Sequence, residues 1–439
     1  MSYCFKLSAI PIPIRQRIAS DLTVTSTSSS KQLSSSLSVE VFYIQEQTNG
    51  DHLIYLPFSY SYHFLLSSVS PILYEYPKLE FKFNGKLLQR QIDIRDETFE
   101  ILNRTKSVVL CLHTGFGKTI FSLYLASKIG LKIIVLCHRK IIMDQWKEAI
   151  ELYLPNISVD IWSPNLSTTP DVLISNVLNI TKWPKEKYLS YGLVIADEVH
   201  TMCTETFSKS FFWLSPKYMI GLSATPYRTD DMDRIIELYF GPEIVSKSMK
   251  KIFNAYQFNT GFVPTVEYMP NGTMNWNSVL NSQAKSVSRN NLICDMVRIF
   301  SNRTILVLIK YVDHARLLYN QLKDKGEDVG VFLGKSKQVD YTCRVLIATY
   351  SKGGVGFDHP KLDMLITAAD VEQNFMQYLG RVFRRDHIMP IYIDIIDNLN
   401  LIKKHAVTRK KICIEAGGKI LNFSKSFKDF DLYRSLLAK

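Results

Sequence analysis

A glycine-containing loop is expected between the apolar run SVVLCL and the helical pattern IFSLYLASKIG. It consists of Thr114, Gly115, Phe116, Gly117, Lys118 and Thr119. Glycines let backbone N–H groups wrap a triphosphate, and the start of the following helix adds positive potential. Lys118 would bridge the β and γ oxygens, and Thr119 would ligate Mg²⁺. Although Leu112 stands where the strict motif has its first glycine, the loop predicts a site for ATP and Mg²⁺.

An acid pair, Asp197-Glu198, ends the apolar run YGLVIA about eighty residues further on. Acids at the end of a buried strand are costly unless they are used. Asp197 is predicted to hold Mg²⁺, directly or through water, and Glu198 to orient and deprotonate the attacking water. Such pairs also occur as helix caps, but their order after a phosphate-binding loop favours ATP hydrolysis.

Short hydroxyl residues follow in the segment GLSATP, which also begins after an apolar run. In isolation they would indicate a turn or a cap. After the acid pair, Ser223 and Thr225 suit a hydroxyl relay that reports loss of the γ-phosphate to another part of the protein.

Buried parallel strands are needed to position these groups. From Phe81 onward, short apolar runs alternate with amphipathic helical patterns, which predicts an α/β doubly wound fold. The pattern pauses around residues 245–300 and then resumes, so two successive parallel-sheet lobes are expected. The runs on which this rests are SVVLCL, KIIVLC, DVLIS, GLVIAD, TILVLI, CRVLIAT, LDMLITA and PIYIDII.

This pattern along the sequence predicts four regions. Residues 1–78, which hold the serine-rich STSSSKQLSSS and an aromatic run, are expected to form a small accessory domain. This domain would recognise or orient a substrate, or serve only as a lid that stabilises the first lobe. Residues 79–248 and 249–425 would form the first and second lobes, and residues 426–439 a tail.

Composition limits the class of protein. The formal charge of +12 suits a polyanionic partner such as nucleic acid, and equally a chain whose lysines serve only solubility. The seven cysteines contain no C-x-x-C pair, which predicts reduced thiols in an intracellular protein with no zinc site. No signal peptide or membrane span is expected, so the protein would be soluble and cytoplasmic or nuclear, or in the host cytoplasm or virion if viral.

The ordered motifs resemble those of superfamily 2 helicases over about residues 85–420. They are TGFGKT, VLCHRKIIMDQW, LISNVLNI, DEVH, SATP, TILVLIKYVDHA, IATYSKGGVGFD and QYLGRVFR. DEVH and QYLGRVFR differ from the motifs of DEAD-box RNA helicases. They are similar to the XPB-type branch, which includes helicases of large DNA viruses and the poxvirus transcript-release helicase. The resemblance implies two tandem RecA-like lobes.

Further site residues are implied by this resemblance. Arg381 and Arg384 would act as arginine fingers, since a guanidinium neutralises charge on the transferring phosphoryl group. Arg385 fits a surface position better. Gln377 would lie near the γ-phosphate, and Gln91 would lie against the adenine, with Gln89 as the competing candidate. Gly356 and Asp358 would face the nucleotide and help to couple ATP hydrolysis to movement of the lobes. His200 would also take part in this coupling.

Nucleic-acid contacts are implied on the opposite side of the lobes. Contacts with the phosphates would bind nucleic acid without preference for a base sequence. The residues implied to make these contacts are Arg139, Ser175, Lys310, Thr349 and Lys352. Four tryptophans, Trp146, Trp183, Trp213 and Trp276, are expected to be packing residues rather than platforms for base stacking. The basic region near the end of the chain would add phosphate contacts or form an exposed, solvated helix. It consists of Lys403, Lys404, Arg409, Lys410 and Lys411.

Together these features predict an ATP-dependent helicase or translocase that acts as a monomer on DNA, with RNA or a hybrid as a possible substrate. Transcription or repair machinery would be its partner. Two alternatives stay open: a duplex translocase or annealing motor that never separates strands, and a non-catalytic scaffold with a helicase fold. Intact Lys118, Asp197, Glu198, Arg381 and Arg384 argue against the scaffold.

Overall fold

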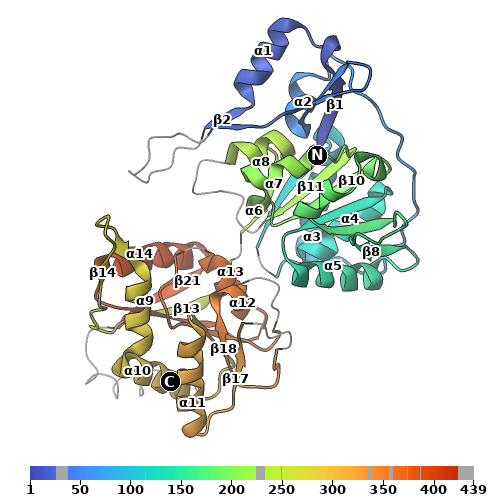
Figure 1. Ribbon diagram of the computed structural model, residues 1–439. Helices are drawn as coiled ribbons and strands as arrows, with labels where there is room; N and C mark the ends of the chain where they lie inside the picture. Colours follow the sequence, from blue (N-terminus) through green and yellow to red (C-terminus); the bar gives the residue numbers. More distant parts are fainter. Residues whose placement is uncertain are drawn as a thin grey trace. The chain divides into compact units, whose positions relative to one another are not determined.

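The computed structural model describes residues 1–25, 38–113, 115–223, 233–248, 250–334, 339–354, 359–372, 374–385 and 387–423. It divides into two compact units, Met1–Lys247 and Ser248–Lys439. Each unit contains a seven-stranded sheet whose strand pairs are all parallel. The expected α/β class with two doubly wound lobes is therefore confirmed (Figure 1).

The sheet of the first unit has the order β12-β6-β11-β10-β7-β9-β8. Its strands are β6 (Ser107–Leu112), β7 (Ile133–Cys137), β8 (Val159–Ile161), β9 (Val172–Asn176), β10 (Leu193–Asp197), β11 (Tyr218–Ser223) and β12 (Ile244–Lys247). Its helices are α3 (Gln89–Thr105), α4 (Lys118–Ile129), α5 (Lys140–Tyr153), α6 (Val199–Met202), α7 (Glu205–Phe211) and α8 (Asp233–Phe240), with 3-10 turns η2 (Val177–Lys182) and η3 (Lys185–Tyr188).

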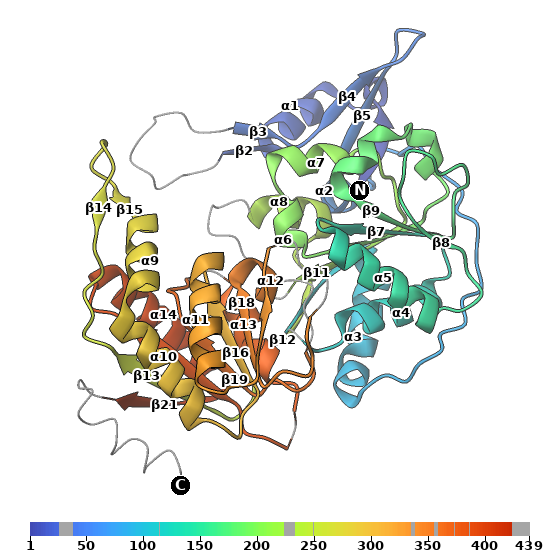
Figure 2. The same cartoon turned by 60° about the horizontal axis from the view of Figure 1, so that its bottom comes forward.

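Successive residues of these strands face opposite sides, so continuous apolar runs are buried on both faces. One face packs against α6, α7, α8 and the N-terminal region through Val109, Ile134, Val194 and Met219. Figure 2 shows α4 and α5 on the other side of the sheet from α7 and α8. This double cover explains why the strands are rich in valine, isoleucine and leucine.

The N-terminal region forms its own antiparallel sheet in the order β1-β5-β4, with strands β1 (Ser2–Lys6), β4 (Tyr43–Glu46) and β5 (His52–Pro57). Beside it lie η1 (Leu7–Ala9), α1 (Ile12–Asp21), α2 (Phe58–Phe64) and the hairpin of β2 (Thr23–Thr25) and β3 (Ser38–Glu40). This region shares one apolar core with the first parallel sheet, in which Phe5 and Phe58 belong to the same cluster as Phe211 and Tyr239.

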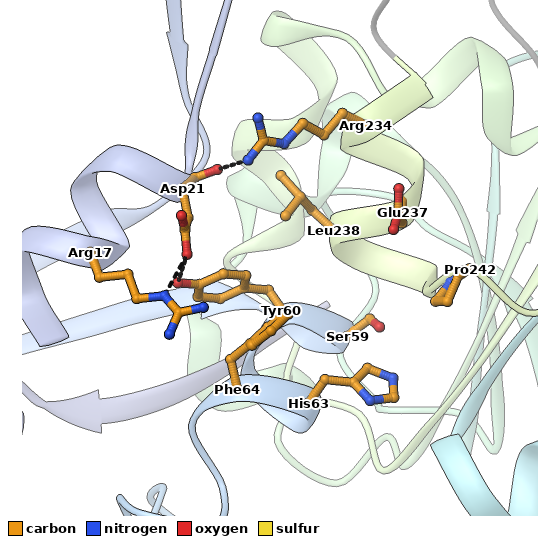
Figure 3. A pocket seen from close by; sticks show the side chains of 10 residues that line it. All are labelled: Arg17, Asp21, Ser59, Tyr60, His63, Phe64, Arg234, Glu237, Leu238 and Pro242. Atoms are coloured by element: carbon orange, nitrogen blue, oxygen red, sulfur yellow. Dashed lines mark hydrogen bonds and ion pairs between the residues drawn. The ribbon is translucent and has the colours of Figure 1, made fainter.

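Polar contacts reinforce that shared core around a cavity of about 600 Å³ (Figure 3). Asp21, which ends α1, accepts hydrogen bonds from Arg17 at 3.3 Å and from the Tyr60 hydroxyl at 2.9 Å. Its backbone carbonyl accepts a bond of 2.7 Å from Arg234 of α8. These contacts join α1, α2 and α8 around the cavity, which is also lined by His63, Phe64 and Glu237.

The sheet of the second unit has the order β17-β18-β16-β19-β20-β13-β21. Its strands are β13 (Phe253–Asn259), β16 (Ile305–Ile309), β17 (Val329–Phe332), β18 (Val345–Thr349), β19 (Met364–Thr367), β20 (Ile391–Ile396) and β21 (Gly418–Phe423), with a hairpin of β14 (Glu267–Tyr268) and β15 (Met274–Asn275). Its helices are α9 (Trp276–Lys285), α10 (Val287–Ile299), α11 (Val312–Asp324), α12 (Tyr350–Gly354), α13 (Phe375–Leu379) with η4 (Gly380–Val382), and α14 (Asn400–Glu415).

The two faces of this sheet also carry separate cores. Val307 and Ile309 of β16 pack with α10 and α11, while Leu306 and Leu308 pack with α13 and α14. The strand β13 and the helices α9 and α10 occupy the region where the sequence pattern pauses. The tail at 426–439 lies outside the described residues. Across the described chain, no helix is both long and apolar enough to cross a lipid bilayer.

Candidate functional site

The glycine-containing loop that the sequence predicts to bind phosphate connects β6 to α4 at the carboxyl edge of the first sheet. Gly115 and Gly117 have φ values of +84° and +87°, the left-handed region that suits glycine. Lys118 and Thr119 form the first turn of α4, where backbone N–H groups have no partner within the helix. The loop thus offers the geometry of an anion cradle. Thr114 lies outside the described residues.

Gln91 braces this loop from the start of α3. Its Oε1 accepts a bond of 2.8 Å from the Leu88 backbone N–H, and its Nε2 donates to the carbonyls of Phe116 and Gly117, both at 3.2 Å. The side chain is only 1% exposed. Gln91 therefore contacts the phosphate loop directly, which is compatible with a place beside a bound nucleotide.

Two neighbours of Gln91 differ from it. The competing candidate Gln89 is exposed and donates to Asp93 at 2.9 Å within α3. Arg90, for which the sequence predicts no role, donates to the Gly115 carbonyl at 2.8 Å and lies over the Phe116 ring. The one sequence signal for this second contact with the loop is the position of Arg90 next to Gln91.

The acid pair lies on the same sheet edge, two strands away from the loop. β11 lies between β6 and β10, with Ser223 paired to Cys111 and Leu222 paired to Asp197. The carboxyl ends of these three strands are therefore aligned. Lys118, Asp197 and Ser223 are brought to one edge by the sheet register, as the motif order predicts.

Asp197 is held in place by an indole. Its Oδ2 accepts a hydrogen bond of 2.8 Å from Nε1 of Trp146, which lies on α5. Burial and the neighbouring charge of Glu198 raise the pKa of the Asp197 carboxyl, while the charge of Lys118 and the Trp146 bond oppose that rise. The sequence predicts that Trp146 is a packing residue. Its 1% exposure confirms burial, and its contact with Asp197 adds a second role.

Glu198 has an uncommon backbone conformation, with φ at +58°. A non-glycine residue in this region is uncommon and often marks a functional constraint. Its Oε2 is buried without a hydrogen-bond partner among the described residues, and His200 Nδ1 lies 3.6 Å from it. A buried carboxylate oxygen without a donor can accept a proton from water placed there.

His200 links the acid pair to the hydroxyl segment. Its Nδ1 is 2.8 Å from Oγ of Ser223, at the end of β11. The structure therefore brings together two of the three predicted coupling residues. Thr225 lies outside the described residues.

The predicted nucleic-acid contacts of the first unit differ in exposure. Arg139 is exposed at the start of α5. Ser175 is fully buried, and its hydroxyl donates to the Asn176 carbonyl at 3.0 Å, so it faces protein in this conformation. The neighbouring Asn176 donates to the His138 carbonyl at 3.1 Å, which joins the ends of β7 and β9.

The second unit contains the predicted arginines. Arg381 is 9% exposed and donates to the Gly354 carbonyl, while Arg384 is partly exposed. Gln377, which lies on α13 shortly before them in the sequence, is also buried. Arg385 is more exposed and pairs with the buried Asp363 at 3.1 Å, which agrees with its assignment to the surface.

The other predicted positions of this unit are spread over the ends of strands. Lys310 follows β16 and is exposed, and Lys352 on α12 is partly exposed with its ammonium over the Phe332 ring. Thr349 ends β18 and is 5% exposed, so little of it reaches solvent. Gly356 and Asp358 lie outside the described residues.

A buried ion network supports the segment before α13. Arg409 of α14 contacts Asp370 and Asp394, each at 2.8 Å, and His405 Nδ1 lies 2.5 Å from Asp370. The hydrogen bond to Asp370 raises the pKa of His405. For Arg409 the expectation of an exposed or phosphate-facing side chain is wrong, because it is 1% exposed. Only the fold, which brings these acids to α14, reveals its partners. Lys403, Lys404 and Lys411 of the same helix are exposed, as expected of a solvated helix.

Sequence relatives of this chain are viral helicase-like proteins. Residues 84–228 match the family model described as "Type III restriction enzyme, res subunit". "Putative helicase 161L" of Invertebrate iridescent virus 6 is 34% identical over 397 residues, covering 84% of this chain and 89% of that protein. "Putative helicase 055L" of Frog virus 3 is 30% identical over 315 residues, covering 69% and 72%. A "Putative ATP-dependent RNA helicase" of Acanthamoeba polyphaga mimivirus is 26% identical over 368 residues, covering 76% and 69%.

Solved structures with the same fold include two helicases. The structure "S. cerevisiae Dbp5 bound to RNA and ADP BeF3" has a TM-score of 0.54 and 14% identity, covering 80% of this chain and 97% of that chain. That of Mycobacterium smegmatis helicase Lhr bound to ssDNA and AMP-PNP has a TM-score of 0.51 and 18% identity, covering 80% and 52%. At these identities the likeness concerns the fold, the tandem RecA-like lobes. With the iridovirus identities and the ordered motifs, these findings show that the chain belongs to the superfamily 2 helicases, in the group that includes these iridovirus proteins.

Proposed function

We propose that this chain is an ATP-driven nucleic-acid motor, a helicase or translocase of the XPB-type branch found in large DNA viruses. The observation that carries the proposal is the shared sheet edge of the first unit. There a left-handed glycine loop with Lys118 lies two strands from Asp197 and Glu198. This arrangement supplies both halves of nucleotide hydrolysis, a phosphate cradle and an acid pair.

The residues at this edge suit Mg²⁺ rather than a metal held entirely by protein. Among the described residues, no group of three or more His, Cys, Asp or Glu side chains is arranged to hold a metal ion. Magnesium usually takes one or two protein oxygens and completes its shell with water and phosphate oxygens. Asp197 and the Thr119 hydroxyl are the proposed ligands. When bound, the ion would neutralise charge on the β- and γ-phosphates.

The chain's own groups would then act as follows. Backbone N–H groups of the loop and Lys118 bind the phosphates, and Gln91 lies against the adenine while it holds the loop. Glu198 accepts a proton from the attacking water through its buried Oε2. His200 and Ser223, which already contact each other at 2.8 Å, would sense loss of the γ-phosphate together with Thr225.

The second lobe would complete the reaction. Arg381 and Arg384 are the proposed arginine fingers, and Gln377, Gly356 and Asp358 the proposed nucleotide- and coupling-facing positions. A planar, permanently charged guanidinium suits a transferring phosphoryl group. The division of the chain between Lys247 and Ser248 supports two lobes that separate near residue 248. Residues 1–78 belong to the same compact unit as the first lobe and share its apolar core, so the proposed accessory domain would be built onto that lobe.

Nucleic acid would bind through phosphate contacts on both lobes. Arg139 and Lys310 are exposed and Lys352 is partly exposed, whereas Ser175 and Thr349 would need a change in exposure. The formal charge of +12 supports a polyanionic partner. DNA is favoured by the branch resemblance. RNA is the second candidate, since a mimivirus relative is described as an RNA helicase. Transcription or repair is the proposed pathway.

The decisive experiment measures ATP turnover with no nucleic acid, single-stranded DNA, duplex DNA and RNA at matched salt, beside a strand-displacement assay. A motor of this kind should show turnover stimulated by at least one nucleic acid, with DNA strongest. Stimulated ATP turnover without strand displacement would support a duplex translocase instead of a helicase. Absence of turnover under all four conditions would refute the motor and favour the scaffold.

A further inference from the structure

Trp146 makes a contact that packing alone does not require. It lies in the middle of α5 and is 1% exposed. An indole carries a single donor and no acceptor, so a buried tryptophan usually places this N–H on a polar acceptor. In this protein the acceptor is Oδ2 of Asp197, at 2.8 Å, a residue 51 positions further along the chain.

The indole is the hydrogen-bond donor to Asp197 within the described part of the chain. It engages one carboxylate oxygen, which leaves Oδ1 as the oxygen available to a cation. An aspartate has two side-chain torsions, and a rigid indole that fixes one oxygen also fixes the direction of the other. Bonds between a donor and an ionised acceptor are among the stronger ones in proteins.

The setting of Asp197 makes such a donor useful. Burial and the adjacent Glu198 both disfavour the charged carboxylate, while Lys118 and the indole favour it. Without the indole N–H, the carboxylate would be partly buried with one fewer stabilising group. Leaving a buried acceptor without its donor is unfavourable, because the acceptor loses its solvation without gaining a partner.

We propose that Trp146 is a positioning residue that orients Asp197 so that its free oxygen meets the Mg²⁺ of the nucleotide. This inference rests on the proposed function, because it assumes that nucleotide binds with Mg²⁺ at this edge. It adds a residue that acts through Asp197 and touches neither nucleotide nor reacting atoms. Other tryptophans serve packing, as Trp183 does beside Trp162 and Tyr188.

The test is equilibrium binding of a non-hydrolysable ATP analogue to the full chain, with and without Mg²⁺. Trp146→Phe keeps an aromatic ring and removes the N–H. Benzothienylalanine incorporated at position 146 keeps the ring outline and replaces the N–H by sulfur, so it separates the lost donor from a packing defect. Trp183→Phe is the matched control, since Trp183 is 5% exposed and packs against Trp162 and Tyr188.

Both changes at position 146 should weaken the Mg²⁺-dependent part of binding by roughly 10-fold or more, the range of one hydrogen bond to a charged group. Binding without Mg²⁺ should stay within about two-fold of wild type, and Trp183→Phe should keep the full Mg²⁺ effect. In turnover assays, the benzothienylalanine protein should need a higher Mg²⁺ concentration for half-maximal rate.

A wild-type Mg²⁺ effect in the benzothienylalanine protein would overturn the role of Trp146. So would an equal loss in the presence and absence of Mg²⁺, because it would indicate a general packing defect. These outcomes differ from failure of the proposed function, in which the wild-type chain itself would bind no nucleotide.

Discussion

Replacing Gly117 by alanine should weaken nucleotide binding by an amount that depends on Gln91. At φ +87° an alanine is strained, and its Cβ would lie 2.6 Å from Gln91 Nε2. The left-handed conformation costs an alanine about 1–2 kcal/mol. Moving the amide away breaks its two bonds to loop carbonyls, which adds about 1–2 kcal/mol in total.

The sum is about 2–4 kcal/mol for holding the loop in the described conformation. If this conformation is the one that cradles phosphate, nucleotide affinity falls by about 30- to 1,000-fold. In a Gln91→Ala background the clash is absent. Gly117→Ala should then cost only the backbone strain, about 1–2 kcal/mol, or roughly 5- to 30-fold.

The assay is calorimetric titration with a non-hydrolysable ATP analogue for wild type, both single variants and the double variant. The expected result is a non-additive double-mutant cycle, since the two residues touch. Gly50→Ala is the control, because Gly50 has φ +82° but nothing within 4 Å of its added Cβ. Equal losses from Gly117→Ala with and without Gln91 would refute the clash.

Three further predictions concern catalysis and stability. Glu198→Gln should bind ATP as wild type does yet lose turnover, measured by phosphate release; near wild-type turnover would contradict its role as the base. Arg381→Ala and Arg384→Ala should each lower turnover by about 10³-fold or more, whereas Arg385→Lys should change it only a few-fold. A loss of a few-fold for both alanine variants would point to surface roles.

The third of these predictions concerns pH. Burial lowers the pKa of His314 to about 3 from 6.5. Below pH 6.5 His314 becomes protonated in the unfolded chain but stays neutral in the folded chain. The free energy of unfolding therefore falls as the pH falls. At pH 5 this costs about 2 kcal/mol, read from denaturant unfolding of the second unit. His314→Gln should remove that part of the acid sensitivity, and an unchanged acid dependence would argue against it.

The sequence alone determined the parallel strands and the phosphate loop. The runs SVVLCL, KIIVLC and GLVIAD are continuous and apolar, so their burial on both faces can be read locally. The strand β13, by contrast, reads FNAYQFN with alternating burial near the edge of its sheet. This polar pattern lacks the apolar signal of the central strands, so the sequence does not predict the strand.

Tertiary structure decided the partners of the individual side chains. The indole of Trp146 reaches Asp197, and the amide of Gln91 reaches the loop 26 residues away. Arg409, in a run that reads as a basic surface, is buried on Asp370 and Asp394. Periodicity records which face of an element is apolar. It does not record which distant residue meets that face, because the register of the sheet and the packing of helices on it set that contact.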